Sequence, residues 1–265
     1  MIVCGNILKM QGSLGDTVTY HLPIGEERLY LNQLLETKLK IEFTGTINCI
    51  DSGKKIKKSY GQGFSYDSFI KLAACDVCIV KPELCHYDKG TCREPDWGLK
   101  NCFQPHVVYL SDTSSIKVGI TRQSQVPFRW IDQGATQAIP VVQVENRLIS
   151  GQVEVELKSM FDDKTNWRNM LKGLTSELDL EEQKEQIFDQ FGDLLDDMGA
   201  DEIETGIVDI KYPVVEYPKK IVSLGFDKNP IIEGILLGIK GQYLIFDVGV
   251  INMRKHQGYE LKISI

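Results

Sequence analysis

Five cysteines lie within one short stretch of the chain and are its strongest chemical signal. They are Cys75, Cys78, Cys85, Cys92 and Cys102, with His86 directly after the third. A C-x2-C pair supplies two thiolates from one tight turn, and Zn²⁺ is commonly held by four such ligands in a tetrahedron. The N-terminus lacks the pattern of a secretory signal, and clustered cysteines in a reducing compartment favour a metal over disulfides. The spacing therefore predicts one Zn²⁺ held by four of the five cysteines.

The spacing leaves the full ligand set open. Beside Cys75 and Cys78, either Cys92 with Cys102 or Cys85 with Cys92 would complete a tetrahedron. Five thiols and one imidazole exceed the needs of one ion, so either one group is a bystander or the site is binuclear. An all-thiolate site keeps no open position, which indicates a structural metal. Free buried thiols are the alternative.

A weaker pattern lies upstream, at Cys49, Ser52, Ser65 and Ser68. These positions have the spacing of two C-x2-C pairs separated by twelve residues, as in a zinc ribbon, but three of the four are serine. Because a neutral hydroxyl is a poor zinc ligand, we interpret this region as a ribbon-shaped backbone without metal. Coincidence in a turn-rich region is the alternative.

The net charge of −7 conceals a strong asymmetry. Residues 177–204 hold twelve carboxylates and one lysine, Lys184; without this segment the 30 basic and 37 acidic residues become 29 and 25. The acidic average therefore does not exclude a polyanionic partner. No apolar run reaches the roughly 18 residues of a membrane-spanning helix. We expect a cytoplasmic protein with no membrane partner.

The elements that would position these residues follow from the periodicity of apolar residues. Strands are predicted at His106–Leu110 and Ile116–Thr121, followed by a helix at Val126–Gln133 and a strand at Ile139–Glu145. Ser150 is the predicted N-cap of the next helix.

The acidic segment is predicted to be a helix with a solvated charged face. Asp179 and Glu182 form a capping box, and Gly199 follows the helix as a stop signal. One apolar stripe runs along it: Ile187, Phe188, Phe191, Leu194, Leu195 and Met198.

Both ends of the chain read as β-structure. Strands are predicted at Thr17–Leu22 and Lys40–Ile47, with a short helix at Leu31–Glu36 between them. Each end is short for a core of its own, so the two are expected to share one barrel or sheet. Little regular structure is expected in 71–105. The C-terminal strands are predicted at Ile207–Val215, Gly234–Gly238, Gln242–Val248, Val250–Arg254 and Gly258–Ile265.

The central segment carries two short runs that are predicted to be neighbouring strands, VVYL (107–110) and KVGIT (117–121). They resemble the paired strands of the GIY-YIG nuclease superfamily, closest to the branch whose second strand reads K-[IV]-G-x-T. Arg129 lies eight residues past Thr121, and Glu154 begins E-x2-L-x3-F, where that branch carries its acidic helix residue. The resemblance implies that Tyr109 helps to activate water, Arg129 neutralises a phosphate, and Glu154 holds Mg²⁺ or Mn²⁺.

Lys117 departs from that pattern, because it stands where the superfamily has its second tyrosine. A lysine binds phosphate but accepts a proton poorly unless its pKa is depressed. The alternative is purely structural: Tyr109 as a core residue, Arg129 on a helix surface, and Glu154 as an i,i+4 partner of Lys158.

Nearly the whole chain also resembles the bacterial domain-of-unknown-function 2797 family. Five runs carry this resemblance: INCIDSGKKIKKSYGQGF, CDVCIVKPELCHYDKGTCREPDWG, KVGITRQSQVPFRWIDQGA, DKTNWRNMLKG and NMRKHQGYE. The family's usual first ribbon has four cysteines, from which this chain departs at Ser52, Ser65 and Ser68.

We therefore expect an α+β fold with a GIY-YIG-like αβ module at its centre. The expected regions are a β-rich part with a degenerate zinc ribbon (1–70), a zinc-binding cysteine segment (71–105), the GIY-YIG-like domain with its acidic helix (106–204) and a β-rich C-terminal part (205–265). The expected function is zinc-containing nucleic-acid binding, extending to divalent-metal-dependent cleavage of phosphodiesters. The alternative is a non-catalytic adaptor that binds a protein partner through the zinc segment and the acidic helix.

Overall fold

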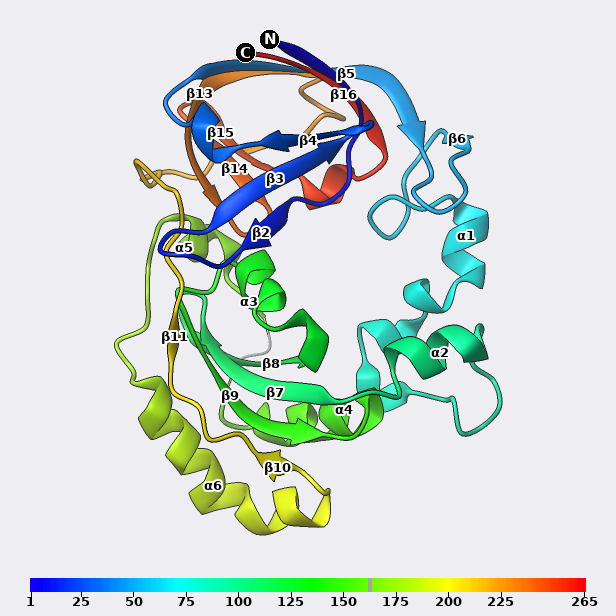
Figure 1. The fold of residues 1–265 in the computed structure, drawn as a ribbon, viewed down its shortest axis with the longest axis vertical. Coiled ribbons are helices and arrows are strands. Elements are labelled where there is room, and N and C mark those ends of the chain that lie inside the picture. The colour runs from blue at the N-terminus through cyan, green and yellow to red at the C-terminus, as the bar shows by residue number, and fades with distance from the viewer. Residues whose placement is uncertain (162–163) are drawn as a thin grey trace. The chain divides into compact units, whose positions relative to one another are not determined.

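The computed structural model describes residues 1–161 and 164–265. It is a mixed α+β protein, as predicted, whose elements are shown in Figure 1. Its residues form two compact units: a terminal unit of 1–70, 171–173 and 211–265, and a central unit of 71–170 and 174–210. Within the described residues, no helix has the length and apolar character needed to cross a bilayer.

The terminal unit is built on one large sheet that joins both ends of the chain. Its strands follow the order β1-β16-β5-β13-β14-β15-β12, and β6 pairs with β5. The bounds are β1 (Ile2–Asn6), β5 (Lys38–Asn48), β6 (Lys55–Ile56), β12 (Ser223–Leu224), β13 (Ile231–Lys240), β14 (Tyr243–Phe246), β15 (Gly249–Asn252) and β16 (Tyr259–Ser264). Because β5 pairs with both β13 and β16, the prediction that the two ends share a sheet is confirmed.

Alternation of apolar residues places the core of this unit. Leu39 and Ile41 of β5 are buried, and so are Leu261 and Ile263 of β16, with a more exposed residue between each pair. A period of two is the signature of a strand with one buried face. A smaller sheet of β2 (Gln11–Ser13), β3 (Thr19–Ile24) and β4 (Glu27–Tyr30) completes the unit.

Two predicted elements at the ends of the chain differ from the structure. The helix expected at Leu31–Glu36 is only a 3-10 turn at Asn32–Leu34. The strand expected at Ile207–Val215 is reduced to β11 (Val208–Asp209), because the chain leaves the central unit for the terminal unit at Lys211.

The central unit contains an antiparallel sheet in the order β10-β9-β7-β8, with β11 also paired to β9. Its strands are β7 (His106–Asp112), β8 (Ile116–Arg122), β9 (Gln137–Val144) and β10 (Asp201–Glu202). The predicted hairpin is confirmed, and β7 pairs with β8 over its whole length. Its helices are α2 (Pro95–Asn101), α3 (Phe128–Gln133), α4 (Arg147–Leu157), α5 (Trp167–Leu171) and α6 (Leu180–Asp197), whereas α1 (Tyr66–Lys71) belongs to the terminal unit except for its last residue.

One face of the central sheet forms the main core. Val108 and Leu110 of β7 are fully buried in a cluster with Val153 of α4 and Ile187 of α6. Tyr109, between them on the strand, faces the other side, where its ring lies 5.8 Å from that of Trp130 in α3. The sheet therefore holds Tyr109 on the α3 side, while α4 and α6 cover the opposite side (Figure 1).

The two long helices have different caps. Asp179 accepts hydrogen bonds from the backbone N–H groups of Glu181 and Glu182, which confirms the predicted start of α6. The prediction of Ser150 as the N-cap of α4 is wrong. Asn146 caps that helix by accepting from Ile149 N–H, and Ser150 lies one turn inside, where its hydroxyl donates to the Arg147 carbonyl.

Candidate metal centre and candidate phosphate site

Four of the five clustered cysteines line one small cavity in the central unit. They are Cys78, Cys85, Cys92 and Cys102, and the space they enclose is about 10 Å³. That volume suits a single water or ion. Cys75 is not among the lining residues, although it begins the C-x2-C pair. All five thiols are free of disulfides.

Short turns and α2 bring these cysteines together. Cys78 lies in the 3-10 turn Val77–Ile79, and Cys85 follows the turn Pro82–Leu84. Cys102 follows α2, where its N–H bonds the Gly98 carbonyl at 2.7 Å. A Cβ added at Gly98 would lie 3.4 Å from Cys92 Sγ and 3.1 Å from the Tyr87 ring. Gly98 thus permits the close packing around the cavity.

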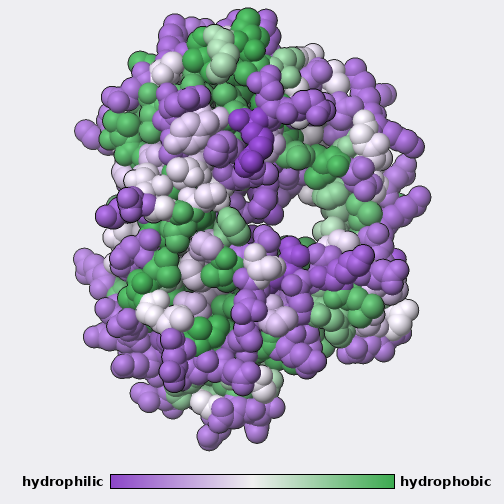
Figure 2. Space-filling model, in the orientation of Figure 1, coloured by the Kyte–Doolittle hydropathy of each residue, from purple (hydrophilic) through white to green (hydrophobic). Residues whose placement is uncertain are grey.

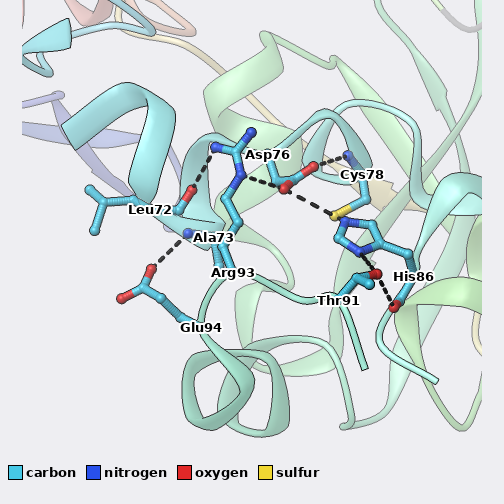
Figure 3. Close-up of polar contacts among 8 residues, drawn as sticks. All are labelled: Leu72, Ala73, Asp76, Cys78, His86, Thr91, Arg93 and Glu94. Carbon is cyan, nitrogen blue, oxygen red and sulfur yellow. Dashed lines mark hydrogen bonds and ion pairs between the residues drawn. The ribbon is translucent and has the colours of Figure 1, made fainter. Parts of the chain in front are cut away.

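A second group of donors shares Cys78 and borders the same cavity (Figure 3). One ligand atom from each of Asp76, Cys78 and His86 lies within 4.8 Å of the others, so this group could hold a metal ion. The Asp76 carboxylate already receives Arg93 Nε at 2.6 Å, and His86 Nε2 lies 3.6 Å from it. His86 Nδ1 contacts the Thr91 hydroxyl at 2.7 Å.

Two thiols of the cavity, those of Cys78 and Cys102, bind their protons more tightly than a free cysteine does. Burial raises the pKa of Cys78 to about 11, and the negative charges of Asp76 and Cys85 add to that effect. Burial also raises the pKa of Cys102. A bound metal would have to displace these protons, so its affinity would increase with pH.

Two of the predicted phosphate-site residues, Arg129 and Glu154, act on a third, Tyr109. This tyrosine is fully buried, and its hydroxyl donates to Gln133 Oε1 at 2.9 Å. Burial raises the pKa of Tyr109; the charge of Arg129 and its hydrogen bond to the phenol lower it, and the charge of Glu154 raises it. A Cβ at Gly119, opposite on β8, would lie 2.7 Å from the Tyr109 hydroxyl oxygen.

Glu154 and Lys117 complete the predicted set. The Glu154 side chain is 14% exposed, and its Oε2 lies 3.5 Å from Lys158 Nζ, so the i,i+4 contact is present. Lys117 is buried on β8 and pairs with Ser111, while Tyr109 pairs with Gly119. Lys117 therefore shares the Tyr109 face of the sheet but lies two positions further along the strand.

Sequence reasoning did not identify Gln133 or Arg147. Gln133 lies four residues after Arg129, so both side chains share one face of α3 and reach the Tyr109 hydroxyl. That spacing was a usable signal. Arg147 is the first residue of α4, and its side chain reaches the cysteine segment through Ile79 O.

In the terminal unit, the four ribbon positions converge around one sulfur. Cys49 Sγ lies 3.1 Å from the donating Ser65 N–H and 3.5 Å from Ser68 Oγ, and Ser52 also hydrogen-bonds it. Burial opposes ionisation, but the hydrogen bonds from Ser52 and Ser68 prevail and lower the pKa of Cys49 to about 6. Hydroxyl and amide donors thus occupy the places of the missing cysteines.

A protein-family model matches most of this chain. The model described as "Protein of unknown function (DUF2797)" covers residues 36–261. Searches of curated proteins and of solved structures found no match. Since the family model spans most of the sequence, the chain belongs to the DUF2797 family.

Proposed function

We propose that this protein binds nucleic acid through its central unit, with Arg129 contacting a phosphate. The proposal is supported by the hydrogen bond between Arg129 and the Tyr109 phenol, and by the charge of Glu154, which acts on the same phenol. Arginine presents a planar fork that matches phosphate oxygens. Because Tyr109 and Gln133 hold one end of the α3 surface in place, Arg129 is oriented before a ligand arrives.

The geometry favours binding over hydrolysis. Tyr109 is fully buried, its proton is donated to Gln133, and burial raises its pKa, so it is poorly placed to accept a proton from water. We therefore assign Tyr109 to the positioning of Arg129. Cleavage is the further possibility that Glu154 supports, because a carboxylate beside a phosphate can hold Mg²⁺ or Mn²⁺.

Binding is tested with fluorescently labelled single-stranded DNA, duplex DNA and RNA. We expect the binding affinity to fall steeply as the salt concentration rises. Arg129→Gln should weaken the binding of all oligonucleotide sequences by a similar factor, because a phosphate contact does not read the bases. Arg168→Gln is the matched control, because Arg168 is an exposed arginine of the same unit that lies against the Trp167 ring. Equal binding by wild type and Arg129→Gln would reject the assignment.

Cleavage is tested separately with chelator-treated protein supplied with Mg²⁺ or Mn²⁺. Glu154→Gln should abolish any product while leaving binding intact or stronger, since it removes a negative charge near the phosphate. If the Glu154→Gln variant still cleaves the oligonucleotide, the activity comes from another group of the protein or from a contaminating nuclease.

We further propose that the metal is a structural Zn²⁺ bound by Cys78, Cys85, Cys92 and Cys102. The shared cavity supports this set, and zinc prefers thiolates to a carboxylate that is already paired with Arg93. Elemental analysis should find about one zinc per chain in wild type and Cys75→Ser, and much less in Cys78→Ser or Cys102→Ser. If His86→Ala also keeps its zinc, the ligands are the four cysteines rather than the group of Asp76, Cys78 and His86.

A groove on the acidic helix favours the second candidate function, an adaptor for a basic protein segment. The groove has a volume of about 380 Å³. Four carboxylates border it, from Glu181, Glu185, Glu202 and Glu204; Lys184 pairs with Glu202, and Ile139 and Phe188 supply apolar surface. The surface over α6, in the lower part of Figure 2, is largely hydrophilic. A Lys-rich peptide should bind wild type more tightly than the Glu181→Gln/Glu185→Gln variant; equal affinities would exclude this groove.

A further inference from the structure

Arg147 connects the cysteine segment to the helix that carries Glu154. Its backbone N–H donates to the Cys102 carbonyl at 2.9 Å, and its Nη2 donates to the Ile79 carbonyl at 2.6 Å. One turn later, Gly151 packs so closely that an added Cβ would lie 2.5 Å from Pro82 Cβ. The first turns of α4 are thus fixed directly to the loops that carry Cys78 and Cys102.

The charges around Arg147 are unevenly arranged. Burial lowers its pKa; the thiolate charges of Cys102 and Cys78 raise it, while Arg129 and Arg122 lower it. Arg147 Nε is buried and has no hydrogen-bond partner among the described residues. The guanidinium is therefore held next to the loops of Cys78 and Cys102 by its bond to the Ile79 carbonyl, and among these groups only the cysteines can supply it with negative charge.

We propose that Arg147 is the counter-charge of the metal centre and that it couples metal binding to phosphate binding; the second half rests on the proposed function. Four thiolates around Zn²⁺ carry a net charge of −2, and burying such a group is unfavourable without a nearby cation. Arg147 supplies one.

The coupling follows from where Arg147 stands in the chain. It begins α4, and Glu154 and Lys158 lie on the same helix and at its end. Loss of the metal frees the loops of Cys78 and Cys102, whose neighbouring carbonyls accept from Arg147, so the first turn of α4 loses an anchor. The group around Tyr109 and Arg129 then loses its fixed relation to Glu154. By linkage, phosphate binding should stabilise the metal by the same factor.

The first experiment measures zinc affinity by competition with a chromogenic chelator. Outer-shell partners of metal ligands typically change metal affinity 10- to 100-fold, and we expect a loss of that order in Arg147→Met. Arg147→Lys, which keeps the charge, should recover much of it, and Arg168→Met should match wild type. Wild-type affinity in Arg147→Met would overturn the counter-charge role. Circular dichroism shows whether Arg147→Met folds; if it does not, Arg147→Lys and Arg147→Gln are compared instead. Full zinc affinity in Arg147→Lys with reduced zinc affinity in Arg147→Gln would support the counter-charge role. Equal zinc affinities of these two variants would overturn it.

The second experiment compares binding of a labelled oligonucleotide by zinc-loaded and zinc-stripped wild type. We expect the stripped protein to bind at least about tenfold more weakly, within the usual range of coupling between sites. Equal affinities would overturn the coupling and leave nucleic-acid binding standing. Absence of binding in both forms would reject the proposed function and the coupling together, while the zinc competition would still decide the counter-charge role.

Discussion

At the scale of single residues, Gly119 determines where the Tyr109 hydroxyl can lie. The two residues are directly paired on β7 and β8, and the tyrosine ring lies over the glycine. Any side chain at position 119 would therefore push the phenol away from Gln133 and Arg129. This close contact is the reason that β8 needs a glycine at position 119. Backbone conformation does not require one there, since Gly119 is not among the residues with positive φ.

We predict that Gly119→Ala destabilises the protein by about 1–3 kcal/mol, as expected for overpacking of a dense core. It should also weaken oligonucleotide binding, because Arg129 loses its hydrogen-bonded support. Urea denaturation and binding titrations check the two effects. Gly192→Ala is the control, since a Cβ there meets nothing within 4 Å and alanine favours the helix. Unchanged stability in Gly119→Ala would contradict the contact.

His106 is a second residue with a measurable consequence. It is fully buried at the start of β7, with Nδ1 bonded to the Gln104 carbonyl at 2.7 Å. Burial lowers its pKa to about 4, helped by the positive charges of Arg147 and Arg122. Between pH 6.5 and 4 the unfolded chain therefore binds a proton that the folded chain does not, and stability falls as the pH falls.

The expected loss from His106 alone is up to about 3 kcal/mol at pH 4, obtained from 1.4 kcal/mol per pKa unit. It should be measured as a difference: wild type minus His106→Gln, by urea denaturation at several pH values with zinc in excess. The difference should be constant above pH 7 and shrink below pH 6. A parallel pH dependence of the two proteins would show that His106 does not titrate in this way.

At the scale of elements, periodicity predicted most of the framework. The hairpin and α6 follow from apolar residues at intervals of two or about 3.6. The shared terminal sheet was predicted from size, because each end of the chain is short for a core of its own. The cap of α4 did not, because Asn146 and Ser150 are both good caps and only the fold decides which begins the helix. The short α2 was also missed, although Pro95 at its first turn was a signal.

In the candidate sites too, some features were predictable from the sequence and others depend on the fold. The sequence identified the cysteine segment, but the choice among five thiols depends on how the turn after Pro82 and the Gly98 region pack, which spacing does not encode. Likewise, the motif placed Tyr109, Arg129 and Glu154 in order along the chain. The hydroxyl acceptor Gln133 and the bridging Arg147 follow only from tertiary contacts.

The serine-substituted ribbon offers a prediction at this scale. Ser65 Oγ lies 3.0 Å from Ser68 Oγ, and Ser68 Oγ donates to Asp51 at 2.7 Å, so hydrogen bonds hold the two knuckles around Cys49. Replacing Ser52, Ser65 and Ser68 by cysteine should add one zinc per chain, because the backbone already has the ribbon arrangement. Elemental analysis checks this against the single variant Ser65→Cys, which should add none. Unchanged stoichiometry in the triple variant would reject the ribbon interpretation.

At the scale of the whole molecule, the candidate metal centre belongs to one unit only. All candidate ligands lie in the central unit, and so do the three tryptophans, Trp97, Trp130 and Trp167. The terminal unit has its own core, built from both ends of the chain on β5, β13 and β16. Tryptophan fluorescence therefore reports on the unit that holds the metal, and amide exchange in β5 and β16 reports on the other.

We predict that chelation lowers the midpoint of the fluorescence transition while the slowest amides of β5 and β16 keep their protection. A ligand that binds only the folded state stabilises it by about 4 kcal/mol when present at a thousand times its dissociation constant, so removal of a structural zinc should shift the midpoint by several degrees or more. The measurement is thermal unfolding with and without chelator, followed by re-addition of zinc. The shift should be absent in Cys78→Ser, which lacks a ligand from the start. An equal loss of protection in β5 and β16 would show instead that the metal stabilises the chain as one cooperative body, and the units would then have to be treated as a single folding domain.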